Sequence, residues 1–250
     1  YVNQHYSSQN KIEVLELGKN LGWSGANNAA IRHALSRKAE YLFLLNNDTV
    51  TDPKAIELLV QRAETEPEIG ALAPKILFAQ NPSIINSLGI ECSCIGSAWD
   101  RAIGRLDNPR WDKSLPVVGG CGAALFIRAE ALRRVGFFAD HFGIYLDDVD
   151  LCLRLWNAGY RVETCPEAIV HHYFSATMGK GKAVRRKYYL NTRNRFWLVL
   201  RNFPANELPR ILKSTVLAEC KALGRAVIEG ELWKVWAHVK SWVAALVYIP

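Results

Sequence analysis

The feature that most constrains the fold is the segment 41–48, which reads Tyr-Leu-Phe-Leu-Leu-Asn-Asn-Asp. Five apolar residues follow one another without alternation, which is typical of a strand buried on both faces in a parallel sheet. The run ends in Asn46, Asn47 and Asp48. Ligands of open α/β sheets bind beyond the carboxyl ends of strands, so Asp48 is a candidate ligand for a divalent cation. Turn chemistry is the alternative explanation for the same residues.

The residues before this strand predict a strand, a turn and a helix. Residues 12–17 alternate partly and predict a short strand, and residues 29–39 carry apolar side chains at helical spacing. The turn between them contains three glycines, which permit a tight backbone near a ligand, and polar residues that could cap the helix. Its glycine spacing matches neither the Walker nor the dinucleotide fingerprint.

The chain after residue 48 predicts further alternation of helices and strands. We expect an amphipathic helix over 53–66, a strand over 69–77, a small-residue turn that enters a strand within 117–128, and a short helix over 129–135. Residues 79–116 are irregular in pattern and rich in Asn, Ser, Gly and Pro. A long loop of this kind inside a compact domain is more often a substrate-facing element than slack chain.

Three carboxylates fall within four residues at the start of a predicted helix over 149–158. They are Asp147, Asp148 and Asp150. Acids at this place can cap backbone amides and complement the helix dipole. Three are more than capping needs, and crowded like charges raise each other's pKa, which suits a proton acceptor. We therefore favour a functional role for this cluster over capping alone.

Two adjacent histidines, His171 and His172, stand at the end of a predicted strand and follow both acidic clusters. A single histidine is usually a core or surface residue. Here two histidines stand at the end of a strand, after two carboxylate clusters in the sequence. One of these histidines is therefore a candidate metal ligand.

The C-terminal part of the chain is basic. From Lys180 to Lys213 there are ten Lys or Arg and one acid, a net charge of +9, although the whole chain carries +7. Mixed Arg, Tyr and Trp on one helix indicates a surface at a membrane interface. The same mixture could bind nucleic acid, but no recognition motif accompanies it, so we do not predict nucleic acid as a partner.

The last segment, 232–246, has apolar residues at i, i+3 and i+4 spacing, which predicts an amphipathic helix that either packs on the domain or lies on lipid. We expect a catalytic domain over residues 1–178 and a basic, amphipathic helical extension over 179–250. An anionic membrane surface is therefore a candidate partner.

Composition favours a packed domain in a reducing compartment. Half of the residues are hydrophobic and 22% are charged, so a core is expected. Of the six cysteines only Cys92 and Cys94 are close in sequence, and none has paired metal-ligand spacing, so we predict reduced thiols rather than a zinc site. No run of about 18 apolar residues marks a transmembrane helix. We expect a cytoplasmic protein, peripheral at the inner face of the cytoplasmic membrane.

The order of these motifs closely resembles glycosyltransferase family 2, and in particular its rhamnosyltransferase-like members with the GT-A fold. The motifs that carry the resemblance lie at residues 20–28, 44–48, 119–128, 136–138, 147–154, 158–160 and 171–172. The resemblance covers about residues 12–204. It implies an α/β fold with a GT-A-type, Rossmann-like, mostly parallel sheet flanked by helices.

The resemblance also implies an activity, namely the inverting transfer of a sugar from a nucleotide-diphosphate-sugar donor to a hydroxyl of a glycan or lipid-linked acceptor. Mn²⁺ or Mg²⁺ would be the cofactor, and envelope polysaccharide or glycolipid synthesis the pathway. The family pattern assigns the metal to Asp48 with His172, or with His171 as the alternative. It assigns the general base to Asp148, with Asp147 as the second candidate, and leaves Asp150 to support the site or meet the acceptor.

A further set of residues would approach the donor by the same resemblance. These are Gly22, Asn27, Asn28, Asn46, Asn47, Gly119 and Gly120.

One departure from the family pattern concerns the start of the chain. Family members begin with a strand, a helix and a second strand that ends in Asp-Asn-x-Ser-x-Asp, and nothing before residue 12 matches this. We therefore expect the chain to begin inside the fold, either as a fragment or as a naturally shortened protein. The alternatives to an active glycosyltransferase are a catalytically silent nucleotide-sugar or glycan binding module and a nucleotidyltransferase.

Overall fold

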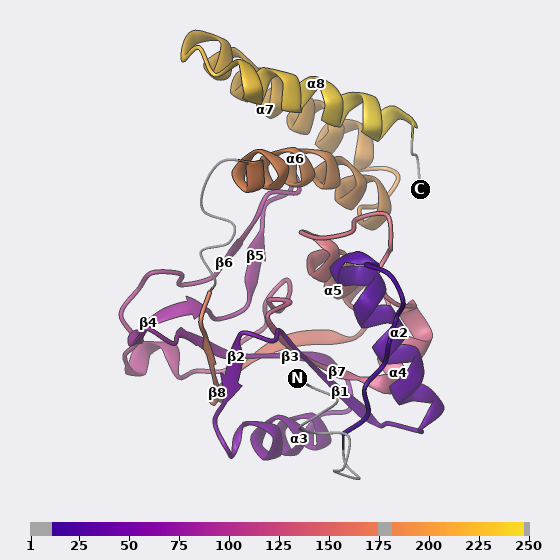
Figure 1. Ribbon diagram of the computed structural model, residues 1–250, viewed down its shortest axis with the longest axis vertical. Helices are drawn as coiled ribbons and strands as arrows, with labels where there is room; N and C mark the ends of the chain where they lie inside the picture. The colour runs from indigo at the N-terminus through magenta and orange to yellow at the C-terminus, as the bar shows by residue number, and fades with distance from the viewer. Residues whose placement is uncertain (1–11, 175–181, 248–250) are drawn as a thin grey trace.

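The computed structural model describes residues 12–174 and 182–247. It is built on a central six-stranded sheet with helices on both faces, and three further helices stand at one end of the molecule (Figure 1). The predicted α/β class and the helical C-terminal extension are both confirmed. The predicted boundary between the two parts, at residues 178 and 179, lies outside the described residues.

The strand order in the sheet is β1-β7-β3-β8-β2, with β4 paired to the other end of β3. The strands are β1 Tyr41–Leu45, β2 Thr49–Thr51, β3 Ile69–Phe78, β4 Asn81–Ser87, β7 Ala124–Arg128 and β8 Arg161–His172. A separate hairpin is formed by β5, Ile90–Cys92, and β6, Ala98–Asp100.

The sheet is mixed, so the expectation that it is mostly parallel was wrong. Among the described strands, only β3 and β8 pair in parallel. Strand β7 lies between β1 and β3 and runs antiparallel to both, so β1 and β3 do not pair directly. The strands β1, β3 and β8 nevertheless point the same way, and their carboxyl ends meet at one edge. A continuous apolar run indicates burial on both faces, which is usual for parallel strands. The antiparallel strand β7 is buried in the same way, so its sequence pattern did not predict its direction.

The helices cover the sheet from both sides. They are α2 Gly22–Ser36, α3 Ala55–Thr65, α4 Ala129–Val135 and α5 Asp147–Asn157. Leu42 and Leu44 of β1 pack in one core with α2, α4 and α5, whereas Phe126 of β7 packs in a second core under α3. Strand β1 buries Leu42 and Leu44 on one face, whereas Tyr41 and Phe43 pack only partly against the second core and Leu45 is 41% exposed. It is an edge strand of the described sheet, so the prediction of a strand buried on both faces was only partly confirmed.

Two predictions for the irregular parts of the chain were wrong. Residues 12–17 form no strand, and their apolar side chains are about two-fifths exposed, as Val14 shows at 40%. No strand of the described chain runs beside them to supply a hydrogen-bond ladder. Residues 79–116, predicted to be irregular, contain β4, β5, β6 and a short 3₁₀ helix, Pro109–Trp111.

The C-terminal extension consists of α6 Lys182–Asn202, α7 Leu208–Ile228 and α8 Leu232–Val247. Helix α6 lies against α5 and the β5–β6 hairpin, and its Trp197 and Leu198 share a core with Phe142, Leu146 and Val149. Helices α7 and α8 lie beyond it (Figure 1). Within the described ranges, no helix has the length and apolar character needed to span a membrane.

Candidate active site

The carboxyl end of β1 and the end of β8 bring Asp48 and His172 together. The β2 strand pairs antiparallel with β8 and sets Thr49 opposite His172, so Asp48 lies beside the histidine. The distance from Asp48 Oδ1 to His172 Nε2 is 3.2 Å. The predicted metal residues are thus neighbours in space although they lie far apart in the sequence.

His172 is oriented by a residue that sequence analysis missed, Asn86 of β4. The imidazole is buried, and its Nδ1 lies 2.8 Å from Asn86 Oδ1. The amide oxygen can only accept, so Nδ1 donates this hydrogen bond and Nε2 is the nitrogen that faces Asp48. A metal-binding histidine is commonly held in this way by a hydrogen bond from its other nitrogen.

The Asp48 and His172 pair fits Mn²⁺ or Mg²⁺ held with open positions. Its donor atoms would be one carboxylate oxygen and one imidazole nitrogen, a combination that suits Mn²⁺ in particular. No third His, Cys, Asp or Glu joins them in the described parts of the chain. An ion bound there would therefore take its remaining ligands from substrate oxygens and water. His171, the alternative ligand, lies opposite Val50 and, by the alternation of β8, faces the other side of the sheet.

The acidic cluster begins α5, and a strained turn precedes it. Tyr145 and Leu146 both have left-handed backbone, with φ of 71° and 61°, a conformation that costs non-glycine residues free energy and is found where the surroundings enforce it. Here Asn194 of α6, fully buried, enforces it. Its side-chain nitrogen donates to the carbonyl oxygens of Phe142, Ile144 and Tyr145 at 3.2, 3.0 and 2.8 Å.

The carboxylate of Asp148 is held by backbone and faces the glycine turn before β7. Its Oδ2 accepts from the Gly122 amide at 2.9 Å, and its Oδ1 accepts from the Val149 amide at 2.8 Å. Burial raises the pKa of Asp148 well above its ordinary value, and the neighbouring charge of Asp147 raises it further. A carboxylate with a raised pKa is suited to accept a proton near neutral pH.

Asp147 has a different environment. It is 3% exposed, and its Oδ2 accepts a hydrogen bond of 2.6 Å from the hydroxyl of Ser24, a fully buried residue of α2. Burial raises the pKa of Asp147 too, while the Ser24 hydrogen bond lowers it. Ser24 thus joins α2 to the acidic turn.

Of the two roles expected for Asp150, support of the site and contact with the acceptor, its contacts favour support. Asp150 is fully buried, and both of its oxygens are used inside the protein. Oδ2 pairs with Arg154 at 3.0 Å, and Oδ1 pairs with Arg201 at 3.0 Å and accepts from Asn202 at 2.9 Å. Asp150 therefore fastens α6 to α5, which sequence spacing could not reveal because Arg201 and Asn202 lie about fifty residues away.

Several of the expected donor-binding residues are structural. Asn28 is 1% exposed, and its amide exchanges hydrogen bonds with the backbone of Phe138 and with Asp140, so nothing of it remains for a ligand. Gly119 and Gly120 are also buried. A Cβ on Gly120 would lie 2.5 Å from Leu125, and one on Gly119 would lie 3.3 Å from Cys152. Their small size serves packing, and a role toward substrates stays a prediction.

Asn46 belongs to the site through a contact that the sequence did not reveal. Its Oδ1 accepts a 3.0 Å hydrogen bond from the indole nitrogen of Trp23, and its backbone amide donates to the Ala123 carbonyl. The same indole limits the size of residue 122, because a Cβ on Gly122 would lie 2.9 Å from Trp23 and 3.3 Å from Asp148 Oδ2. These contacts join the turn that carries Asp48 to the one that faces Asp148.

Three further residues predicted to approach the donor lie in α2 or in the turn after β1. The side-chain nitrogen of Asn27 donates to the Trp23 carbonyl at 2.9 Å. Gly22 begins α2 with φ of +72°. Asn47 is exposed in the turn after β1. Their role toward a donor stays a prediction.

Asp100, at the end of β6, is a site residue that sequence analysis missed. Burial raises the pKa of Asp100, partly offset by hydrogen bonding to Ser87 and Cys121. The negative charge of Asp100 in turn raises the pKa of Asp148, and proximity to His172 lowers the pKa of Asp100. Asp100 thus lies close enough to both carboxylate centres to interact with them. The only sequence signal was its position in a polar segment expected to face substrate.

Comparison with families and curated proteins gives consistent matches. A family model described as glycosyl transferase family group 2 matches residues 41–249. The O-antigen biosynthesis protein RfbC of Myxococcus xanthus is 30% identical over 175 residues, which cover 66% of this chain and 13% of that protein. An N-acetylglucosaminyl-diphospho-decaprenol L-rhamnosyltransferase of Mycobacterium tuberculosis is 29% identical over 199 residues, which cover 69% of this chain and 62% of that protein. The chain thus spans less than two thirds of either relative.

Among solved structures, the crystal structure of GalNAc-T7 with UDP, GalNAc and Mn²⁺ is similar to this one. The TM-score is 0.53 at 13% sequence identity, and the match covers 81% of this chain and 43% of that chain. At this identity the likeness shows the fold, which is of the GT-A type.

Proposed function

The chain belongs to glycosyl transferase family group 2, as the order of its motifs predicted, and on that premise we propose that it transfers a sugar from a nucleotide-diphosphate-sugar to an acceptor hydroxyl with inversion. The observation that carries this proposal is the presence of two separate carboxylate centres at one edge of the sheet. Asp48 stands with His172, and Asp148 stands beside Gly122 with a raised pKa. Such a transfer needs one group that holds the donor diphosphate and another that accepts a proton.

Asp148 is the base of the proposed reaction. The acceptor oxygen attacks the anomeric carbon on the side opposite the leaving diphosphate, which inverts the configuration, and its proton passes to Asp148. Two backbone amides fix the orientation of the carboxylate. Asp147, held by Ser24, keeps a second charge close by, and this charge raises the proton affinity of Asp148.

Asp48 and His172 would hold Mn²⁺ or Mg²⁺ in the proposed enzyme. When bound, the ion supplies positive charge that offsets the charge developing on the leaving diphosphate. Asn86 keeps Nε2 of His172 directed at Asp48. The crystal structure of GalNAc-T7 with UDP and Mn²⁺ supports a divalent ion, as an analogy of fold.

The pathway and location are also part of the proposal. The names of the two relatives, an O-antigen biosynthesis protein and a rhamnosyltransferase that names a diphospho-decaprenol, support envelope polysaccharide or glycolipid synthesis and a lipid-linked acceptor. The apolar side chains of α8, exposed to solvent, and the basic residues of α6 support peripheral attachment to an anionic membrane. The inner face of the cytoplasmic membrane is where such a protein would meet nucleotide-sugars.

Calorimetric titration of UDP, dTDP and GDP tests the donor site, with and without Mn²⁺. We expect one of these to bind only with the metal, and Asp48→Asn to abolish that binding. Asp52→Asn is the matched control, because it removes the same charge from an exposed residue near Asp48. A folded protein that binds no nucleotide diphosphate in a metal-dependent manner would overturn the proposal. Binding without sugar transfer would instead indicate a silent binding module.

A further inference from the structure

Asp100 has a buried carboxyl oxygen without a hydrogen-bond partner. The residue ends β6, and in the described parts of the chain nothing donates to its Oδ1, although that atom is shielded from solvent. Burial raises the pKa of Asp100 and hydrogen bonding to Ser87 and Cys121 lowers it, but neither of these neighbours donates to Oδ1. A buried polar atom without a partner costs free energy, and in an enzyme it is a candidate contact for a substrate. The surroundings of Asp100 indicate which part of a substrate would meet it.

The β5–β6 hairpin turns Asp100 toward the acidic turn. Asp100 lies directly opposite Ile90 in this antiparallel pair, so the two side chains stand on the same face of the hairpin. Ile90 shares a core with Leu146 and Val149, which lie on either side of the acidic pair that includes Asp148. The carboxyl group of Asp100 therefore lies on the face of the hairpin that packs toward the proposed base.

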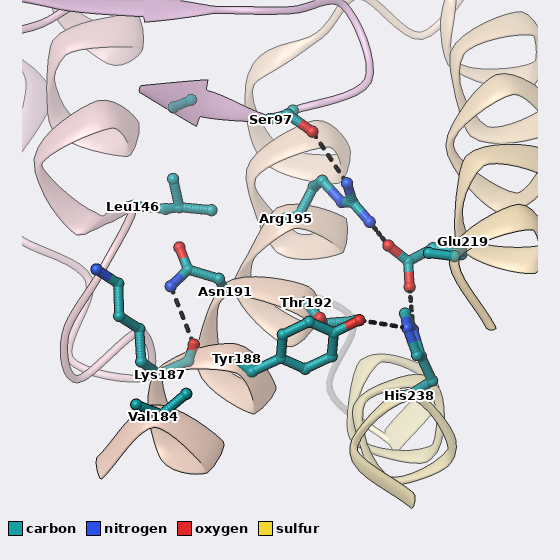
Figure 2. Close-up of a pocket in the computed structure, with 13 residues that line it drawn as sticks. Ser97, Leu146, Val184, Lys187, Tyr188, Asn191, Thr192, Arg195, Glu219 and His238 are labelled. Carbon is teal, nitrogen blue, oxygen red and sulfur yellow. Dashed lines mark hydrogen bonds and ion pairs between the residues drawn. The ribbon is translucent and has the colours of Figure 1, made fainter. Parts of the chain in front are cut away.

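The hairpin is held in place by the three C-terminal helices. Arg195 of α6 donates to Ser97 of the hairpin at 2.9 Å and forms an ion pair with Glu219 of α7 (Figure 2). Nδ1 of His238 on α8 lies 2.7 Å from the same carboxylate. The hairpin also approaches α6 closely, since a Cβ on Gly96 would lie 2.9 Å from the side chain of Arg195. The position of Asp100 is therefore fixed before a substrate binds, as a recognition site requires.

On one side, Asp100 lies next to a residue that adjoins the proposed base. This neighbour, Cys121, immediately precedes Gly122, whose amide donates to Asp148 Oδ2 at 2.9 Å. Burial, and then the charges of Asp100 and Asp148, raise the pKa of Cys121. The thiol therefore lies close to both carboxyl groups.

On the other side, Asp100 lies next to a residue that adjoins the proposed metal pair. This neighbour, Ser87, immediately follows Asn86, whose Oδ1 lies 2.8 Å from Nδ1 of His172. Nε2 of the same ring lies 3.2 Å from Asp48 Oδ1. Asp100 is therefore situated between the metal pair and the base.

The transferred sugar must occupy the same place in the proposed reaction. Its anomeric carbon is bonded to the diphosphate held at Asp48 and is attacked by the oxygen that gives its proton to Asp148. We propose that Oδ1 of Asp100 accepts a hydrogen bond from a hydroxyl of this sugar and thereby selects among donor sugars. A carboxyl oxygen accepts readily from a hydroxyl, and a sugar without a hydroxyl at that position would leave the oxygen unpaired. The inference rests on the proposed function, to which it adds a specificity-determining residue.

Titration of free nucleotide diphosphates and of nucleotide-sugars, all with Mn²⁺, tests this role. The probes are UDP, dTDP and GDP, each compared with its sugar conjugates UDP-glucose, UDP-galactose, dTDP-rhamnose and GDP-mannose. Asp100→Ala should leave the affinity for the free nucleotide diphosphate unchanged and weaken binding of the nucleotide-sugar by about tenfold or more, the size expected for a lost hydrogen bond to a charged group. Asp100→Asn has nearly the same shape and keeps one acceptor oxygen, so it should give a smaller loss.

Glu91→Ala is the matched control, because it removes a carboxylate from the other face of the same hairpin, where Glu91 accepts from Trp99 at 2.9 Å. Thermal unfolding would show that each variant is folded. The readout is the ratio of the affinities for a nucleotide-sugar and its free nucleotide diphosphate, which a merely structural role would not change. A ratio that both Asp100 variants leave unaltered for every probe, while free nucleotide still binds, would overturn the inference and leave the proposed function standing. Absence of metal-dependent nucleotide binding by the folded wild type would instead overturn the proposed function, and this inference with it.

Discussion

At the scale of single residues, the three acids of one short segment have three different environments. Asp147 accepts from Ser24, Asp148 accepts from backbone amides, and Asp150 is ion-paired to Arg154 and Arg201. Their types and spacing are local information, but the partner of each comes from a distant part of the chain. Those partners distinguish the proposed base, Asp148, from the neighbouring charge, Asp147, and from the structural anchor, Asp150.

The environment of Asp148 predicts the pH dependence of the proposed transfer. Burial first, and the charge of Asp147 second, raise the pKa of Asp148 to about 7. The base works only when deprotonated, so the rate should rise with pH through that value and level off above it. Asp147→Asn removes the second cause while keeping an acceptor for Ser24, and it should shift the profile toward lower pH.

Initial rates of sugar transfer across pH 5 to 9, measured for the wild type and Asp147→Asn, would check this expectation. Asp148→Asn is the control, and it should reduce the rate by about 10²-fold or more at every pH while leaving nucleotide binding intact. A wild-type profile that is flat through neutral pH, or a shift of the variant to higher pH, would contradict the assignment of Asp148.

At the scale of elements, helix α6 holds the acidic turn in place. Asn194 binds three carbonyl groups of the turn that contains the left-handed residues Tyr145 and Leu146, and Arg201 and Asn202 bind Asp150 at the start of α5. The basic character of α6 had indicated a surface for anions. Part of that charge is instead used within the protein to fasten the C-terminal extension to the α/β part of the chain.

Asn194→Ala is expected to lower the free energy of unfolding by about 1–3 kcal/mol, because it leaves buried carbonyl oxygens without a donor. The transfer rate should fall further than stability alone explains, since the turn presents Asp148, whereas metal-dependent nucleotide binding at Asp48 should persist. Chemical denaturation and steady-state kinetics would measure the two effects.

Asn157→Ala provides the matched control for this variant. Its side-chain nitrogen donates to a single carbonyl, that of Asn202, at 3.0 Å and away from the turn. We expect a smaller loss of stability and an unchanged transfer rate per folded molecule. Equal kinetic effects of the two variants would argue against a positioning role for Asn194.

At the scale of the whole molecule, the apolar stripe of α8 faces away from the protein. Leu232 and Leu246 are 75% and 77% exposed, and Trp236 is 60% exposed. The face that packs on α6 and α7 carries the small or polar residues Ala237, His238, Ser241 and Ala245. Of the two alternatives for this helix, packing on the domain is confirmed for α8 itself, because its small and polar face lies against α6 and α7. The apolar stripe takes no part in that packing, and its contact with lipid stays a prediction.

The exposed stripe predicts binding to membranes that is lost when its leucines are replaced. A fully buried leucine contributes about 1.5–3 kcal/mol, so the double variant Leu232→Ser, Leu246→Ser should weaken binding to vesicles containing phosphatidylglycerol by about tenfold or more. Cosedimentation with such vesicles, and with phosphatidylcholine vesicles at several salt concentrations, would measure it.

Leu106→Ser is the control, because Leu106 is 64% exposed on the catalytic part of the chain. Vesicle binding should be unchanged in this variant. If the double variant binds vesicles as tightly as the wild type, α8 does not contact lipid, and a second protein becomes the better candidate for its apolar stripe.

The sequence by itself determined the features that depend on neighbouring residues. The strand β1 and the helices α3, α4 and α5 were predicted correctly, because an apolar run and helical spacing are patterns of adjacent residues. The family followed from the order of motifs and is confirmed.

Only the tertiary structure decided which chain segments meet. It placed β7 antiparallel between β1 and β3, separated His172 from His171, joined Asn86 to His172 and Asn194 to the acidic turn, and turned the stripe of α8 outward. It also assigned Asn28, Gly119 and Gly120 to packing. These outcomes depend on contacts between residues far apart in the chain, and a local pattern specifies a face or a type of residue without specifying what lies against it.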